Sequence, residues 1–274
     1  TSTSGGTDSI ANVENINTGS GDDTITINDF SNNTIDTNGG TDVLTVEGGA
    51  GTITLTRTGT DVAVSDTGSG IGTDSYLDIE QVNVSGDDNA NTFIVTDTFA
   101  NEIDGQGGVD TISYASASAT TVTITGDSAV VDTGDIGNDT LTNIESITTG
   151  SDDDVFDISG NPTIDYILDG GSGFNTFDFS GAVTGDFTLD TSASSFLDFS
   201  NFTGSGITID LSSTSQQSVT GSLDITLGTG SLFNTINGSA QQDDITGSTG
   251  DDTIRAGAGN DIIDGGAGED TLFY

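Results

Sequence analysis

Cysteine, histidine, lysine and methionine are absent from the 274 residues. Without cysteine and histidine, the chain has no disulfide, no thiolate or imidazole metal ligand, no cysteine nucleophile and no Ser/His triad. Without lysine it has no amine nucleophile. The metal ligands that remain are oxygens, which favour hard cations such as Ca²⁺.

Basic residues are nearly absent as well. Arg57 and Arg255 stand against 44 acidic residues, so the formal net charge is −42. A compact fold with this self-repulsion needs counter-ions, and bound divalent cations would supply them. Nucleic acids and anionic membranes attract basic patches, so we expect neither nucleic-acid binding nor membrane insertion.

Long apolar runs are also missing. No stretch approaches the roughly 18 residues of a membrane span, and no basic-then-apolar signal peptide opens the chain. Because methionine is missing even at position 1, we expect a processed product or a piece of a longer protein. High acidity can indicate disorder, but here β-branched and aromatic residues recur regularly between Gly, Asp and Asn turns, which favours strands.

Short repeats are the clearest feature that is present. Residues 238–273 divide into four consecutive nine-residue units, GSAQQDDIT, GSTGDDTIR, AGAGNDIID and GGAGEDTLF, and TGSLFNTIN at 229–237 is a weaker unit in the same phase. The sixth position of the four units is acidic and the eighth is aliphatic. These positions are Asp243, Asp252, Asp261 and Asp270, and Ile245, Ile254, Ile263 and Leu272.

The same phase recurs upstream in three degenerate blocks of three units each, at residues 18–45, 86–113 and 149–178. Ile27 is a single insertion in the first block. A short segment of related sequence precedes each block. It carries an acidic residue for which two roles are open, a structural cap or an extra metal ligand. These acids are Glu14, Glu80 and Glu145, spaced 66 and 65 residues apart.

These units resemble the RTX (repeats-in-toxin, haemolysin-type) calcium-binding nonapeptide G-G-x-G-x-D-x-U-x, where U is a large aliphatic residue. The chain is similar to long secreted or surface-layer and adhesin-type members. The resemblance implies an all-β fold, a right-handed parallel β-solenoid (β-roll) with two nonapeptides per coil and Ca²⁺ between units n and n+2. It also implies export by type I secretion and folding on Ca²⁺ outside the cell.

Carried onto this chain, the resemblance pairs Asp243 with Asp261 and Asp252 with Asp270. The upstream pairs are Asp23 with Asp42, Asn91 with Asp110, and Asp154 with Asn175. An amide removes charge, so we expect weaker or empty sites in the second and third blocks. The middle units, with Asn33, Asn101 and Tyr166 at the sixth position, are expected to bind nothing.

Glycines in these loops allow positive φ and let backbone carbonyls point at one ion. The predicted metal-site residues are therefore Asp243, Asp252, Asp261, Asp270, Gly247, Gly250, Gly257, Gly259, Gly265, Gly268, Asp23, Asp42, Asp110 and Asp154.

The chain is divided into four segments by these patterns. Residues 1–17 are interpreted as the tail of a preceding repeat, 18–178 as degenerate RTX-like super-repeats, 179–228 as solenoid coils without clear metal loops, and 229–273 as the regular array. Period-two stretches at 52–64 and 120–131 each contain a glycine near the middle, so either hairpins or solenoid coils fit there. No helix is expected, because 3.6-residue periodicity is missing and Gly is frequent.

The leading functional hypothesis is an extracellular or cell-surface structural or adhesive protein, as in a surface layer, a filament or a large adhesin. Its expected partners are calcium ions, further copies of itself, and cell-surface or polysaccharide groups. The alternative is an accessory repeat region of a secreted toxin or exoenzyme whose catalytic domain lies outside this chain. We expect no enzyme activity, because carboxylate pairs such as Asp22 and Asp23 lie within the repeat phase.

Overall fold

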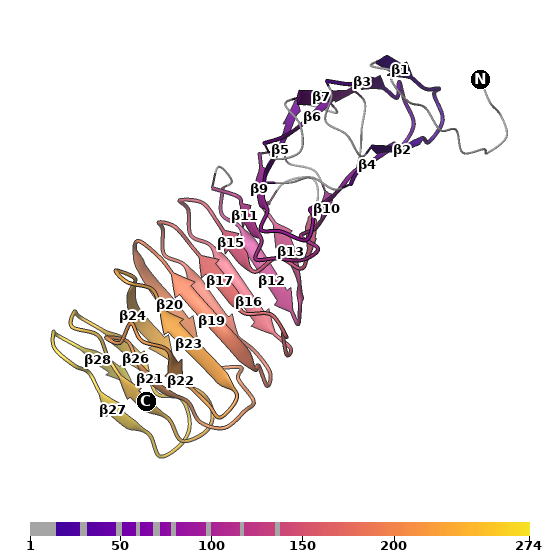
Figure 1. Ribbon diagram of the computed structural model, residues 1–274. Helices are drawn as coiled ribbons and strands as arrows, with labels where there is room; N and C mark the ends of the chain where they lie inside the picture. The colour runs from indigo at the N-terminus through magenta and orange to yellow at the C-terminus, as the bar shows by residue number, and fades with distance from the viewer. Residues whose placement is uncertain are drawn as a thin grey trace. The chain divides into compact units, whose positions relative to one another are not determined.

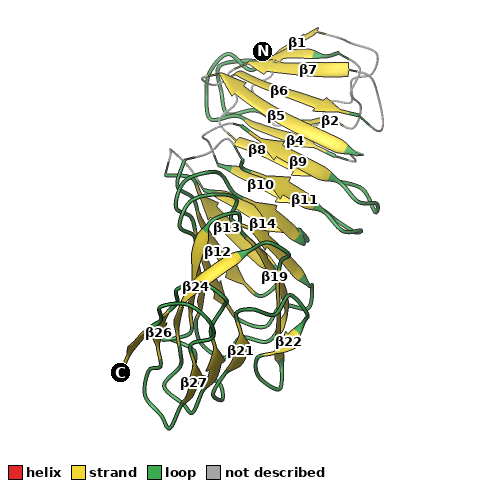
Figure 2. Cartoon of the chain, turned by 90° about the vertical axis from the view of Figure 1, so that its left-hand side faces the viewer, coloured by secondary structure: helices red, strands yellow, loops and turns green. Residues whose placement is uncertain are grey.

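The computed structural model describes residues 15–27, 32–47, 51–58, 61–67, 72–77, 81–96, 100–115, 118–134 and 138–274. Within these ranges every regular element is a β-strand, and Figure 2 shows strands and loops without a helix. The predicted all-β fold is confirmed. Strands form where apolar and polar residues alternate, because this pattern gives a pleated sheet one face that can be buried.

The chain divides into two compact units. The N-terminal unit comprises residues 1–113 and 135–143, and the C-terminal unit comprises residues 114–134 and 144–274. In each unit most neighbouring strands are parallel, and successive coils of the chain add strands to the same sheets.

The N-terminal unit contributes two sheets (Figure 1). The strand order in one is β1 (Asn15–Asn17), β3 (Thr34–Asp36), β7 (Gly72–Leu77), β6 (Asp61–Asp66), β5 (Thr52–Thr58), β9 (Thr92–Val95) and β11 (Thr111–Ser113). In the other it is β2 (Thr24–Ile27), β4 (Val43–Val46), β8 (Gln81–Ser85), β10 (Asn101–Asp104) and β14 (Asp139–Thr142).

The C-terminal unit has three sets of hydrogen-bonded strands. The first is β15 (Ser146–Thr148), β17 (Tyr166–Asp169), β19 (Gly185–Asp190), β23 (Leu223–Leu227) and β22 (Gln217–Ser218). The second is β13 (Ser128–Asp132), β12 (Thr121–Thr125), β16 (Val155–Ser159), β18 (Thr176–Phe179), β20 (Ser194–Asp198), β24 (Leu232–Asn237), β26 (Thr253–Arg255) and β28 (Thr271–Phe273). The third is β21 (Thr208–Asp210), β25 (Asp244–Thr246) and β27 (Ile262–Asp264).

The strand register gives the length of a coil. In the C-terminal repeats Ile245 lies opposite Ile263 and Ile254 lies opposite Leu272, so each offset equals two nonapeptides. In the first upstream block Ile25 lies opposite Leu44, one residue further, because Ile27 is inserted between the units. The predicted parallel solenoid is therefore confirmed.

Two antiparallel excursions interrupt the parallel pairing. Strands β5, β6 and β7 form an antiparallel meander, and β12 and β13 form a hairpin that turns at Gly126, where φ is +62°. Of the two alternatives for these stretches, the hairpin is the one observed in the described residues. Between 179 and 228, β19 and β20 pair in parallel with their neighbours, whereas β22 and β23 are antiparallel.

The core consists of the inward-facing residues of the strands and changes character along the chain. Aliphatic side chains such as Ile35, Leu44 and Val82 fill the N-terminal unit. Between β16 and β24 buried aromatic side chains join the aliphatic ones, namely Phe156, Tyr166, Phe177, Phe179, Phe187, Phe199, Phe202 and Phe233. Ile245, Ile254 and Ala256 fill the last coils.

Candidate metal centre

The sixth residue of the nonapeptides turns into the protein next to the strand that follows it. Asp243 and Asp252 are only 1% and 2% exposed, whereas Asp261 is half-buried and Asp270 is exposed. Upstream, Asp23 is half-buried, and the fully buried residues at equivalent positions are Asp42, Asn91, Asn101, Asp110, Asp154 and Asn175. Buried carboxylates require compensating partners, since their desolvation is costly.

These side chains stack from coil to coil through one recurring hydrogen bond. The side-chain oxygen of the later residue accepts the backbone N–H of the earlier one. Asp23 and Asp42 are joined in this way at 2.8 Å, Asn91 and Asp110 at 2.6 Å, Asp154 and Asn175 at 3.0 Å, Asp243 and Asp261 at 3.1 Å, and Asp252 and Asp270 at 3.0 Å. In all five predicted pairs, the sixth residues of repeat units n and n+2 are thus neighbours in the structure.

Two serines in the C-terminal repeats hold the buried carboxylates in place. Oδ1 of Asp243 accepts the Ser239 hydroxyl at 2.7 Å and the Ile207 N–H at 2.8 Å, while Oδ2 accepts the Ser239 N–H at 2.8 Å. Asp252 Oδ2 accepts the Ser248 N–H at 2.7 Å. These hydrogen bonds therefore orient the two carboxylates.

Burial also disfavours the ionised form of some of these carboxylates. Burial raises the pKa of Asp252 above its usual range, with smaller contributions from the charges of Asp270 and Asp251. Burial likewise raises the pKa of Asp154. An adjacent cation favours the ionised form, so a bound divalent ion would offset this effect.

Most of the predicted loop glycines lie against backbone carbonyls of the neighbouring coil. A Cβ on Gly247 would overlap the Gly265 carbonyl oxygen, and one on Gly257 would overlap that of Ser239. Gly259, Gly265 and Gly268 are similarly confined, by Gln241 O, Asp270 Oδ2 and Gly250 O respectively. Gly250 differs, because a Cβ there would meet nothing closer than Ser248 Oγ at 3.8 Å.

The asparagines of the amide-containing pairs satisfy their own side-chain polar groups. Nδ2 of Asn175 donates to the Gly170 carbonyl at 2.8 Å and to Thr191 Oγ1 at 3.2 Å. Oδ1 of Asn91 accepts the Asp87 N–H at 2.9 Å, and its Nδ2 donates to the Asp87 carboxylate at 3.2 Å. In these loops an asparagine side chain therefore makes hydrogen bonds at the position where the acidic pairs have a second carboxylate.

The donor set fits a hard cation only if backbone oxygens take part. Among the described residues, no three acidic side chains gather closely enough to hold a metal ion by themselves. Each acidic pair offers two carboxylates, and Ca²⁺ takes six to eight oxygens at flexible geometry. The carbonyls that crowd the loop glycines are the remaining oxygens at hand.

Asp139 is a stacked residue that the repeat pattern did not indicate. It is 4% exposed, and its Oδ1 accepts both the backbone N–H of Asn101 at 2.8 Å and its Nδ2 at 2.9 Å. Asn101 therefore belongs to the same kind of stack. The signal was the sequence Asp-Thr-Leu at 139–141, which matches positions six to eight of a nonapeptide.

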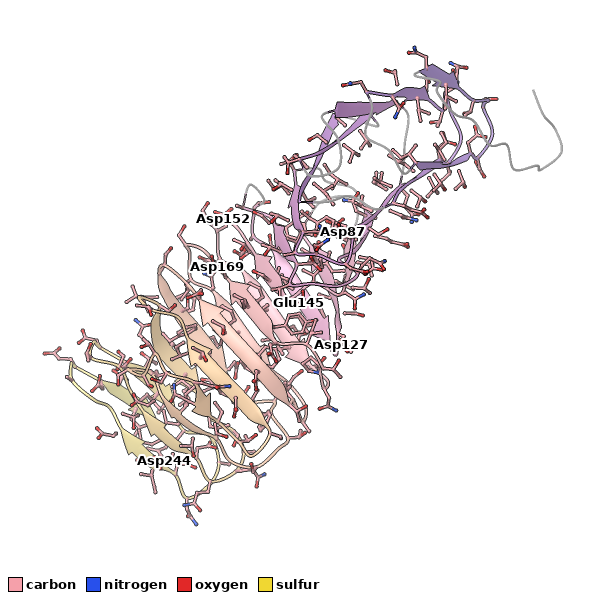
Figure 3. All side chains as sticks on the ribbon, in the orientation of Figure 1. Asp87, Asp127, Glu145, Asp152, Asp169 and Asp244 are labelled. Carbon is pink, nitrogen blue, oxygen red and sulfur yellow. The ribbon has the colours of Figure 1, made fainter. Side chains whose placement is uncertain are left out.

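Acids at the ninth position have a different role, because they start the loops. The carboxylate of Asp169, labelled in Figure 3, accepts the N–H of Gly171 at 2.9 Å. Asp36, Asp104 and Asp264 make the equivalent bond to the residue two positions later. These bonds are Asx turns, which stabilise the chain reversal without metal.

The remaining candidate residues lie apart from the acidic pairs. Tyr166 is buried and donates to the Gly126 carbonyl at 3.2 Å, and burial, Asp127 and Glu145 raise its pKa. Figure 3 labels Asp127 and Glu145. Glu14 and Glu80 lie outside the described residues. Asn33 is half-buried next to β3.

Comparison with known proteins identifies the repeats. The sequence matches the RTX calcium-binding nonapeptide repeat in four copies, over residues 29–53 and 237–272. The matched residues include Asp42 and the four sixth-position aspartates of the last repeats. RTX nonapeptides are calcium-binding motifs, so the predicted repeat type and the predicted ion are confirmed. No curated protein matches the chain.

Proposed function

We propose that this chain is an extracellular, calcium-binding structural or adhesive repeat protein, part of a surface layer, a filament or a large adhesin. The observation that carries the proposal is the stacking of acidic sixth-position residues from successive coils, with Asp243 bonded to Asp261 and Asp252 to Asp270. Calcium binds between the stacked loops and allows them to fold at a net charge of −42.

The ligands differ between the pairs. Asp243 with Asp261, Asp252 with Asp270, and Asp23 with Asp42 supply two carboxylates each, and carbonyls of the glycine loops complete the shell. Asp110 and Asp154 each face an amide across the coil, so their sites bind calcium weakly. Residues 229–273 form the main array, and residues 18–178 are its degenerate relatives.

A structural role agrees with the chemistry of the chain. RTX repeats are structural elements and are typical of extracellular proteins that leave the cell by type I secretion. The sequence offers no cysteine, histidine or lysine for catalysis. Within the described residues, no helical segment has the length and hydrophobicity that a membrane crossing requires. The partners are calcium, other copies of the chain, and surface polysaccharides.

Two measurements test the adhesive role. One is sedimentation of the purified chain in calcium and in chelator, and the other is its binding to cell-surface polysaccharide. We expect the chain to assemble, or to bind polysaccharide, only when calcium is present. We expect no turnover of the polysaccharide. A chain that stays monomeric and binds no surface polymer in calcium contradicts the proposal, as does turnover of the polysaccharide.

A further inference from the structure

The C-terminal unit contains a stretch in which every fully buried residue is uncharged. We call residues 155–237, from β16 to β24, the aromatic segment, and residues 238–273 the C-terminal array. The contrast between these two parts bears on how calcium controls folding, and the inference below rests on the proposed calcium-dependent function.

Stacked rings hold the aromatic segment together. Phe156 and Phe177 stack with centroids 4.8 Å apart, and Phe179 and Phe199 stack at 5.1 Å. Phe187 joins two further contacts, stacked on Tyr166 at 5.9 Å and edge-on to Phe179 at 5.5 Å. Each such pair stabilises the fold beyond the burial of its apolar area.

The fully buried polar residues of the aromatic segment are neutral. Between residues 156 and 237 they are Asn175, Thr191 and Ser195. Thr191 accepts from Asn175 at 3.2 Å and bonds to Ser195 Oγ at 2.9 Å. These groups satisfy one another. The acids Asp178 and Asp190 in this stretch are half-buried, and burial raises the pKa of both, which favours their uncharged form.

The C-terminal array has the opposite character. Its fully buried apolar side chains are Ile245, Ile254 and Ala256, and its buried acids are Asp243 and Asp252. Leu272, at an inward position of the last strand, is 38% exposed. A small core combined with buried carboxylates makes this array the part of the unit that depends on calcium.

The two parts are joined edge to edge. Strand β24 of the aromatic segment pairs in parallel with β26 of the array, with Ile236 opposite Ile254. Strand β21 likewise pairs with β25, with Ile209 opposite Ile245. In a solenoid each coil is stabilised by its neighbour, so an ordered edge lowers the cost of adding the next coil.

We propose that the aromatic segment folds without calcium and acts as the template on which calcium assembles the C-terminal array. Removal of calcium then melts the array back to the edge formed by β24 and β21, and re-addition restores it from that edge.

Hydrogen exchange of the whole chain, read by mass spectrometry in millimolar calcium and in chelator, tests this order. Amides of β16, β18 and β20 should keep their protection within about threefold in chelator. Array amides should lose about 100-fold protection for each site that calcium filled at 100 times its dissociation constant. Joint loss of protection in both parts overturns the inference, whereas an array protected in chelator contradicts the proposed function.

A pair of variants tests the direction of the coupling. Phe177→Leu keeps an apolar side chain but removes the ring stack, and it should lower the calcium affinity of the array. Asp252→Asn should weaken calcium binding while leaving the protection of β18 unchanged. Unchanged calcium affinity in Phe177→Leu, or loss of β18 protection in Asp252→Asn, would overturn the template.

Discussion

The adjacent residues Asp243 and Asp244 allow a test of the calcium site with an internal control. Asp243 is 1% exposed and accepts three hydrogen bonds, from Ile207 N, Ser239 N and Ser239 Oγ. Asp244, labelled in Figure 3, is exposed. Asp244 is the first residue of β25 and Asp243 directly precedes it, so replacing either with asparagine removes one negative charge from the same place.

The expected magnitude has two parts. An amide presents one acceptor oxygen in place of two, so Asp243→Asn leaves at least one backbone N–H facing an NH₂ group, at a cost of about 1–3 kcal/mol. The second part depends on calcium. Raising calcium from its dissociation constant to 100 times that value adds about 2.3 kcal/mol for each site.

Urea unfolding at these two calcium concentrations, followed by circular dichroism, measures both parts. Asp243→Asn should be less stable at either concentration, and its gain with calcium should be smaller than that of the unsubstituted chain by about 2.3 kcal/mol. Asp244→Asn should stay within about 0.5 kcal/mol of that chain throughout. An undiminished gain in Asp243→Asn would mean that this carboxylate serves hydrogen bonds alone.

Three further predictions use the same matched design. Gly247→Ala should destabilise the array by about 1–3 kcal/mol because its Cβ overlaps a carbonyl, whereas Gly250→Ala should be nearly neutral, and urea unfolding compares them. Asn175→Asp should destabilise the calcium-free chain and add one bound ion, counted by titration calorimetry, since it gives Asp154 an acidic partner. Burial, Asp198 and Asp157 raise the pKa of Asp178, so protonation at low pH is favoured in the folded chain and its stabilisation is lost as pH rises. Asp178→Asn should therefore stabilise the chain by about 0.5 kcal/mol at neutral pH, and its melting temperature should fall less as the pH rises above about 4.

Much of the coil geometry was predictable from the sequence because it follows from spacing. The acid at position six and the aliphatic at position eight fix which residues stack, and Asp252 and Asp270 meet as expected. The single insertion of Ile27 likewise explains the longer offset between Ile25 and Leu44.

The features that spacing did not reveal depend on contacts distant in sequence. Asp139 stacks on Asn101, which lies 38 residues earlier, so the nine-residue period does not reveal this pair even though Asp-Thr-Leu at 139–141 fits the nonapeptide. Period-two patterns fit a hairpin and a coil equally, and only pairing distinguishes them, as for β12 and β13. The serines at 239 and 248 stand where the RTX pattern has glycine, and their bonds to the carboxylates follow from side-chain geometry.

Anomalous diffraction from crystals of the whole chain grown in millimolar calcium tests the central claim most directly. Calcium peaks should lie between the loops that present Asp243 and Asp261, and between those that present Asp252 and Asp270, with carboxylate and carbonyl oxygens around each. Ordered loops whose carboxylates bond only to backbone N–H groups, with no peak between them, would contradict the account.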